Sequence, residues 1–348
     1  MVHDGFRVFG RNKPARYLPD SARSSHRQLS DLRSVPMKRS RCGFTLVELV
    51  VAGALAAIVG ATIMFTLQKK ERFYGSAAEV MRLRSQLRDA SDVLVADIRG
   101  AAVSRYGLAL MTDTALELFT TLGSSVVCTS PTGRTLFLPP STLASGTVLT
   151  SFLALPDTGD LALLYSIPGG NPDSAQWIEA RISGFGTRPL TSSCPSTTAF
   201  TSALDAAAGK IGYALTLPAN PPAGLRSGAP VRFIRRARYS LYRSSDGDWY
   251  LGYRRCSPVG PSICSTIQPV SGPYLPYTKA GGAAAGISFH YFDSSGVELF
   301  DVALSTRIAR IDVVLRGETA RAVSLVGDAR QRYRDSSVVS VSPRNRMR

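Results

Sequence analysis

A single carboxylate lies within an apolar segment near the start of the chain. Glu48 is the only charged residue between Phe44 and Leu67, a run of 24 residues that directly follows Gly43. An ionised carboxylate at the centre of a membrane helix costs about 2.5–3.5 kcal/mol on insertion scales, so Glu48 needs an interfacial position or a cationic partner. Cleavage between Gly43 and Phe44 would create an α-amino group near Glu48, and that amine is a suitable partner.

The apolar segment predicts a membrane-spanning helix. At about 1.5 Å per residue, residues 44–67 extend about 36 Å, which exceeds the bilayer core of about 30 Å. A secretory signal peptide has a shorter apolar region, and the sequence QKKERFY after Leu67 offers no small-x-small cleavage site. We therefore expect residues 44–67 to anchor the protein, with membrane lipid as their partner before any assembly.

Basic residues precede the apolar segment. Residues 1–43 contain ten Lys or Arg and three acids, a net charge of +7 out of +16 for the whole chain. Such a leader favours a cytoplasmic N-terminus and a single pass through the inner membrane, with an extracytoplasmic C-terminal domain. Residues 1–36 are polar and lack hydrophobic periodicity, so we expect them to be disordered. A start at Met37 would leave a leader of seven residues, so we hypothesise that translation begins there and that residues 1–36 are a mis-called extension.

The leader and the apolar segment together resemble the type IV pilin and pseudopilin family. The residues that carry the resemblance are Lys38, Arg39, Arg41, Gly43, Phe44, Thr45, Leu46, Val47 and Glu48. The resemblance implies that a prepilin peptidase cleaves after Gly43 and methylates the amine of Phe44. It also implies that Glu48 pairs with the terminal amine of a neighbouring subunit during filament assembly. The alternative is an ordinary signal-anchor helix that happens to carry a glutamate.

The helical pattern continues beyond Leu67. Apolar residues recur at a spacing of three or four, at Phe73, Val80, Leu83, Leu87, Ala90, Leu94 and Ile98. This spacing predicts an amphipathic helix over residues 68–100 that is half-buried against a domain. Together with residues 44–67 it forms a stalk of about 55 residues, far longer than the usual globular helix of about 12.

Residues 101–348 consist of short β-rich runs separated by Pro, Gly and Ser, which predicts an antiparallel sheet domain and an α+β fold. The clearest hairpin joins residues 231–243 to 249–255 through Asp246-Gly247. Further strands are expected at 161–167, 287–292, 297–303 and 308–316. Pro, Gly and Ser indicate loops at 188–203, 218–230 and 257–286.

Three downstream segments also resemble the larger minor pilins of the PilW type and the J-type pseudopilins of type II secretion. They are Tyr239–Arg243, Phe289–Phe292 and Val339–Asn345. The resemblance implies a minor pilin that assembles with other minor and major pilins, and the large head favours a place at or near the pilus tip. The alternatives are a J-type pseudopilin and a signal-anchored extracytoplasmic binding protein.

Four cysteines remain once Cys42 is removed with the leader, and they are Cys128, Cys194, Cys256 and Cys264. All four follow the membrane segment, which fits an oxidising compartment. Four cysteines allow three pairings, of which we favour Cys256 with Cys264 and Cys128 with Cys194. A zinc site is the alternative, but the sequence has no C-x-x-C pair and no histidine close to these cysteines.

Catalytic signatures are missing from the sequence. It contains no G-x-S-x-G, phosphate loop or dinucleotide fingerprint. His290 is the one histidine after Gly43, and it falls in an expected strand among aromatic residues. We therefore expect no enzyme activity, no cofactor and no metal site.

Arginines concentrate on the expected hairpin. Arg232, Arg235, Arg236, Arg238, Arg243, Arg254 and Arg255 accompany Tyr242, Tyr250 and Tyr253. Such a mixture can track phosphates and stack bases, which makes nucleic acid a candidate partner for this surface. The alternatives are a solvated strand face and an interface with acidic partner pilins.

Overall fold

The computed structural model describes residues 43–131, 133–195, 198, 200–258, 260, 263–277, 285–324 and 329–343. The expected start at Met37, the basic residues Lys38, Arg39 and Arg41, and Cys42 lie outside the described residues, as does Asn345. By their contacts, residues up to Thr62 form one unit and residues from Ile63 onward form a second.

One long helix, α1 (Leu46–Gly100), contains 55 residues. It begins after Thr45, whose carbonyl accepts a hydrogen bond from the Leu49 amide and whose hydroxyl accepts one from the Glu48 amide, each at 3.2 Å. It ends at Gly100, where the Thr121 hydroxyl donates to the Gly100 carbonyl at 2.7 Å. The prediction of one continuous helix up to residue 100 is confirmed.

Short helices and strands follow α1. In chain order they are α2 (Val103–Tyr106), β1 (Leu110–Met111), β2 (Ala115–Val126), β3 (Thr135–Leu138), β4 (Ser151–Phe152), β5 (Leu161–Ser166), η1 (Pro168–Gly170), η2 (Pro172–Ser174), β6 (Gln176–Arg181), β7 (Gly184–Pro189), α3 (Leu190–Ser193), α4 (Ala203–Ala207), β8 (Ile211–Thr216), β9 (Pro230–Arg243), β10 (Trp249–Cys256), β11 (Gln268–Tyr274), β12 (Ile287–Phe292), η3 (Val302–Arg307), β13 (Arg310–Glu318) and β14 (Arg334–Val341). These strands pair antiparallel, so the α+β prediction is confirmed at the level of one long apolar helix and a large antiparallel sheet domain.

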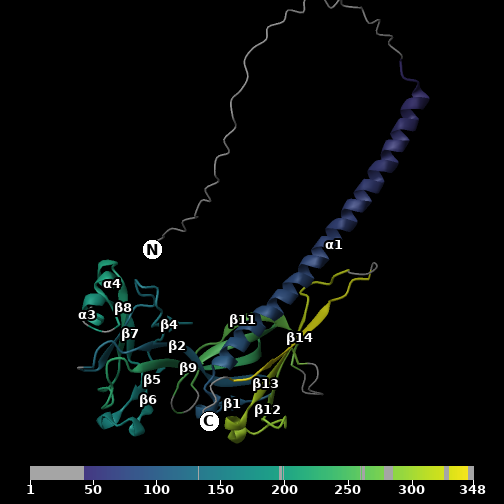
Figure 1. Ribbon diagram of the computed structural model, residues 1–348. Helices are drawn as coiled ribbons and strands as arrows, with labels where there is room; N and C mark the ends of the chain where they lie inside the picture. The colour runs from purple at the N-terminus through teal and green to yellow at the C-terminus, as the bar shows by residue number, and fades with distance from the viewer. Residues whose placement is uncertain are drawn as a thin grey trace, which may run out of the picture. The chain divides into compact units, whose positions relative to one another are not determined.

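The second half of α1 packs on the larger sheet, in which the strands are ordered β1-β2-β9-β10-β11-β13-β12 and β14 pairs with β13. Figure 1 shows α1 lying beside this part of the sheet. The α1 residues in the shared core are Leu83, Leu87, Ala90, Leu94 and Ile98. Burying each Leu or Ile contributes about 1.5–3 kcal/mol, so this face holds the end of the stalk helix on the sheet.

Strands β2 and β9 are long enough to reach a second core. There β5 pairs with β9 and β6, and a separate three-stranded sheet is ordered β3-β8-β7. Leu122, Leu136, Leu164, Leu215 and Phe233 are buried between these elements. We call the part formed by β3 to β8 with α3 and α4 the distal lobe. The long strands make it continuous with the part of the sheet that holds α1.

Several expected boundaries were wrong. Phe73 is 55% exposed and does not belong to the packed face of α1. Residues 297–303 were expected to form a strand, but Asp301 accepts a hydrogen bond from the Ala303 amide at 2.9 Å and caps η3. The expected loop at 257–286 contains β11, whose prolines and glycine suggested a loop, although the segment pairs with β10. The expected loop at 188–203 contains α3.

Candidate functional site

The segment expected to be processed lies at the start of α1. Gly43, Phe44 and Thr45 precede the helix and are exposed, and Phe44 is 79% exposed. A peptide bond outside a helix is open to a protease, because the backbone groups around it are not committed to helical hydrogen bonds. The geometry is compatible with cleavage after Gly43.

Glu48 occupies the first turn of α1. A carboxylate there interacts favourably with the positive end of the helix dipole, an effect of about 0.3–1 kcal/mol at an exposed site. The spacing Thr45-x-x-Glu48 is also a helix-start signal, and it fixes the beginning of α1 more closely than hydrophobicity does. Glu48 therefore has a local structural role beside any role in assembly.

The first part of α1 exposes apolar surface throughout. From Leu46 to Leu67 every residue is exposed, and α1 is long and apolar enough to cross a membrane. Exposed large side chains on a single helix are stable in lipid, where apolar contact with the acyl chains replaces contact with water. Among the residues that the structure describes, α1 is the one helix that meets this description.

The arginines of the β9–β10 hairpin are largely committed to internal ion pairs. Glu117 on β2 is fully buried, and its two carboxylate oxygens accept hydrogen bonds from Arg236 Nε at 2.5 Å and Arg238 Nε at 2.6 Å. Arg238 lies directly opposite Glu117 in the pairing of β2 with β9, and Arg236 lies two residues further along the same face. Strand register therefore brings both cations to one acid.

A second buried acid neutralises two more cations. Asp160, which is 2% exposed, accepts two hydrogen bonds from Arg235, from Nε at 2.9 Å and from Nη2 at 2.7 Å. Arg255 Nη2 lies 3.0 Å from Asp160 Oδ1, the oxygen that also accepts from Arg235 Nε, and Arg255 Nη1 binds Asp157 at 2.7 Å. Burial tends to lower the pKa of Arg235, but the Asp160 carboxylate outweighs this effect and leaves that pKa raised.

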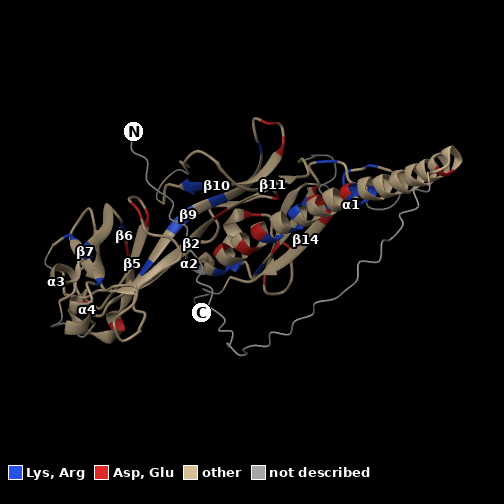
Figure 2. Ribbon diagram, turned by 90° about the horizontal axis from the view of Figure 1, so that it is seen from above, with Lys and Arg blue, Asp and Glu red and all other residues tan. Residues whose placement is uncertain are grey.

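Three arginines of the hairpin, Arg232, Arg243 and Arg254, are outside these ion pairs, and Arg243 Nε donates to the Gly247 carbonyl at 3.2 Å. The Arg232 guanidinium lies 5.0 Å from the centre of the Trp177 ring, so that this indole face is already covered. Arg254 is half-buried on β10, and among the described residues no ion pair involves it. Figure 2 shows that Lys and Arg recur along β9 and β10, but most of this charge is internally neutralised. Contact with nucleic acid stays a prediction, and this geometry does not favour it.

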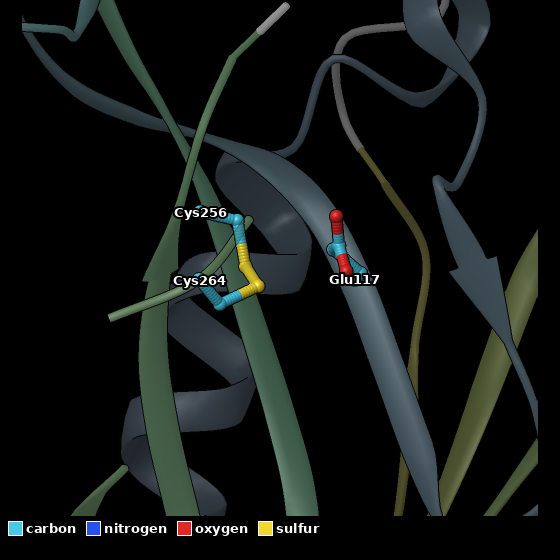
Figure 3. Close-up of side chains that lie close together, drawn as sticks. All are labelled: Glu117, Cys256 and Cys264. Carbon is cyan, nitrogen blue, oxygen red and sulfur yellow. A yellow bond between two sulfur atoms is a disulfide. The ribbon is translucent and has the colours of Figure 1, made fainter. Parts of the chain in front are cut away.

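Both expected disulfides are present. Cys128 pairs with Cys194 and Cys256 with Cys264, and the first bond joins the end of β2 to the segment after α3. Figure 3 shows the second disulfide beside Glu117.

Three potential metal-ligating atoms lie close together here, and they belong to Glu117, Cys256 and Cys264. The two sulfurs are bonded to each other, and the carboxylate is neutralised by arginines. This group does not fit a metal site in the disulfide form, because thiolates are the ligands that zinc requires.

The stalk helix is connected to the sheet by a half-buried polar contact. The Tyr239 hydroxyl donates a hydrogen bond to Asp97 Oδ2 on α1. Burial raises the pKa of Asp97, while the hydrogen bonds from Tyr239 and Thr120 act in the opposite direction. Burial and the neighbouring Asp97 carboxylate raise the pKa of Tyr239, so the phenol stays protonated as the donor.

Sequence patterns did not identify Glu117, Asp160 or Asp97. Each of these acids meets its partner across 75 or more residues of chain, and the Glu117–Arg236 pair spans 119 residues. In contrast, His290, which the sequence placed in a strand among aromatic residues, has its Nδ1 2.8 Å from Glu298 across a local turn. Comparison with protein-family models, curated proteins and solved structures found no match to the chain.

Proposed function

We propose that this protein is a minor pilin that is cleaved after Gly43 and assembled through α1 into a type IV pilus or its priming complex. The observation that carries the proposal is Glu48, the only charged residue in the exposed apolar part of α1, residues 46–67, which begins next to a Gly-Phe bond. A charge placed this way is unfavourable in lipid, and it becomes favourable when a subunit supplies a terminal amine nearby.

Phe44 and Glu48 have complementary roles in this proposal. A prepilin peptidase would release and methylate the amine of Phe44, and Glu48 would pair with such an amine on a neighbouring subunit. Other minor and major pilins would then cover the apolar surface of residues 46–67, which membrane lipid covers before assembly. The protein acts by assembly and performs no catalysis.

The head supports a place at or near the tip. Eleven strands form the larger sheet and three form the smaller one, which gives a bulky domain on a single helix. A bulky head is difficult to repeat at every step of a shaft, whereas a tip or initiation complex needs few copies.

Intact-mass and N-terminal analysis of protein from membranes, with and without prepilin peptidase, tests the proposal. A chain that begins with N-methylated Phe44 only when the peptidase is present would support it. An uncut chain in both membranes would favour a signal-anchored extracytoplasmic binding protein. If cleavage occurs, deleting the pilus system and the type II secretion system separately tells a minor pilin from a J-type pseudopilin.

Two variants separate processing from assembly. Gly43→Arg places a large side chain at the cleavage position and is expected to block processing. Gly75→Arg is the control, because it makes the same change at an exposed glycine beyond the apolar segment, where a side chain meets no other atom. Glu48→Gln is expected to permit cleavage and to reduce recovery in sheared filaments at least about tenfold, which corresponds to about 1.4 kcal/mol. Glu71→Gln removes the same charge beyond the apolar segment and should leave recovery unchanged.

A further inference from the structure

Basic residues outnumber acidic ones beside α1 just beyond the apolar segment, where Glu71 is the one acid between Leu67 and Ser76. Lys69, Lys70 and Arg72 follow Leu67 on the helix, and Arg321 and Arg330 lie on the chain that joins β13 to β14. We call these five residues the basic collar. All five belong to the unit that begins at Ile63, so their arrangement does not depend on the placement of the first unit.

Hydrogen bonds hold the β13–β14 connection against α1. The Ser324 amide donates to the Ser76 hydroxyl at 3.1 Å, and Ser76 is the first buried residue of α1. Further along the helix, Arg84 donates to Asp335 at 3.0 Å and to the Tyr333 hydroxyl at 3.3 Å. Figure 1 shows the described parts of this connection beside α1. The connection therefore approaches α1 at Ser76, about one helical turn beyond Arg72.

The charge of the basic collar is available to a ligand. No ion pair joins Lys70, Arg72, Arg321 or Arg330 to another residue in the described part of the chain, and Lys69 lies over the Phe65 ring at 4.7 Å. Figure 2 shows Lys and Arg of α1 and of the neighbouring connection gathered in one region. This differs from the β9–β10 hairpin, where buried acids neutralise the guanidinium groups.

A hollow at the base of the β13–β14 connection carries further arginines. It measures about 680 Å³ and is lined by Glu318, Gln331, Arg332, Tyr333 and Arg334. Arg332 and Arg334 share the one Glu318 carboxylate, at 2.7 Å and 3.4 Å. Two guanidinium groups beside a single acid leave net positive charge on the lining, and Arg side chains suit phosphate oxygens because they donate in pairs.

Aromatic side chains occupy the same short stretch of helix. Phe73 is 55% exposed and Tyr74 is 67% exposed, and neither joins the packed face of α1. At about 1.5 Å per residue, the helix rises about 13 Å between Leu67 and Ser76, enough to pass through a polar headgroup layer of about 5–8 Å. Aromatic and cationic residues directly after an apolar span are typical of a membrane–water interface.

We infer that the basic collar binds anionic phospholipid headgroups, with Phe73 and Tyr74 at the membrane interface. The inference rests on the membrane-anchored state of the proposed function, before assembly. Anionic lipid is the occupant that fits both the continuity with the apolar segment and the charge, because polybasic residues next to a membrane helix are attracted to such lipid. Binding would hold the head against the membrane until the subunit is extracted.

The test uses the full chain reconstituted in vesicles of phosphatidylcholine, with or without phosphatidylglycerol. Amide hydrogen exchange is measured over residues 318–335 and over the distal lobe. We expect exchange in residues 318–335 to be slowed several-fold by phosphatidylglycerol, and high salt to remove this effect. Exchange in the distal lobe should be the same in both vesicles.

Matched variants show whether the basic collar causes the effect. Arg321→Gln with Arg330→Gln should abolish the slowing, whereas Arg188→Gln with Lys210→Gln removes the same charge from the distal lobe and should retain it. Unchanged exchange outside residues 318–335 shows that each variant is folded.

Equal exchange of residues 318–335 in the two kinds of vesicle would overturn the inference. Slowing of that exchange that requires an added pilin instead of phosphatidylglycerol would also overturn it. N-terminal analysis of the same sample keeps this result separate from the proposed function, because cleavage after Gly43 does not require lipid binding by the basic collar.

Discussion

Two glutamates each face two arginines, and their surroundings differ. Glu117 is fully buried and contacts Arg236 and Arg238 between β2 and β9. Glu318 at the end of β13 contacts Arg332 and Arg334, whose side chains are 55% and 71% exposed. In the interior the arginines cannot leave their acid without losing buried ion pairs, whereas near the basic collar they can turn to water or to a ligand. The number of arginines in a segment therefore does not measure the charge available to a partner.

The largest expected effect on stability comes from removing the buried charge of Glu117. Glu117→Gln should lower the free energy of unfolding by about 3–5 kcal/mol, because two guanidinium groups lose their compensating carboxylate. Glu318→Gln is the matched control and should cost less than about 1 kcal/mol, since its partners are exposed. Urea denaturation of the full chain in detergent measures both. Equal losses would show that burial does not distinguish the two sites.

A second test concerns the disulfide beside Glu117. Arg236 Nη1 donates to the carbonyls of Ser257 and Gly260 at 3.1 and 3.3 Å, and the Cys256–Cys264 bond closes the loop that carries these carbonyls. Replacing both cysteines by serine should cost about 2–3 kcal/mol, the chain-entropy expectation for a loop of this length. Combining this change with Glu117→Gln should cost less than the sum of the two, because both loosen Arg236. Additive losses, measured by the same denaturation, would show that the loop and the ion pairs act separately.

A third test concerns Asp97, a half-buried acid that accepts hydrogen bonds from the hydroxyl groups of Tyr239 and Thr120. Its pKa is raised by burial, so the folded state binds a proton more readily than the unfolded state, in which the pKa is about 3.9. Stability from this group is complete below the unfolded pKa and is lost as pH rises toward the folded pKa. We therefore expect Asp97→Asn to gain stability relative to the parent as pH rises from about 4, which urea midpoints at several pH values would measure. A constant difference between the two proteins would contradict the raised pKa.

The smallest expected effect on stability is at the basic collar. Arg321→Gln with Arg330→Gln should change the free energy of unfolding in detergent by less than about 0.5 kcal/mol, because both side chains are exposed and no described residue forms an ion pair with them. Urea denaturation of this double variant and of Glu117→Gln under the same conditions compares the two losses of unfolding free energy directly. A loss of several kcal/mol would mean that these arginines belong to the interior network.

The parts of the fold that follow from local pattern were predictable. The heptad-like spacing of Leu83, Leu87, Leu94 and Ile98 predicted the packed face of α1, and Asp246-Gly247 predicted the β9–β10 hairpin. Gly247 has φ of 91°, a conformation that glycine adopts without strain. In contrast, the sequence analysis did not predict β2. This strand pairs with β9 along most of its length, but no local sequence pattern marks that distant partner.

The sequence by itself determined the long helix, the single charge at Glu48 in its apolar part, the antiparallel character of the head and the four cysteines after the apolar segment, since these depend on composition and short-range spacing. Only the tertiary structure decided which charges are neutralised. Glu117 and Asp160 reach the arginines of β9 through strand pairing and packing between distant segments. Arg321 and Arg330, which nothing in the sequence distinguishes from those arginines, stay exposed beside α1. Ion pairing falls off over a few ångströms, so it follows distance in the folded chain and not position along the sequence.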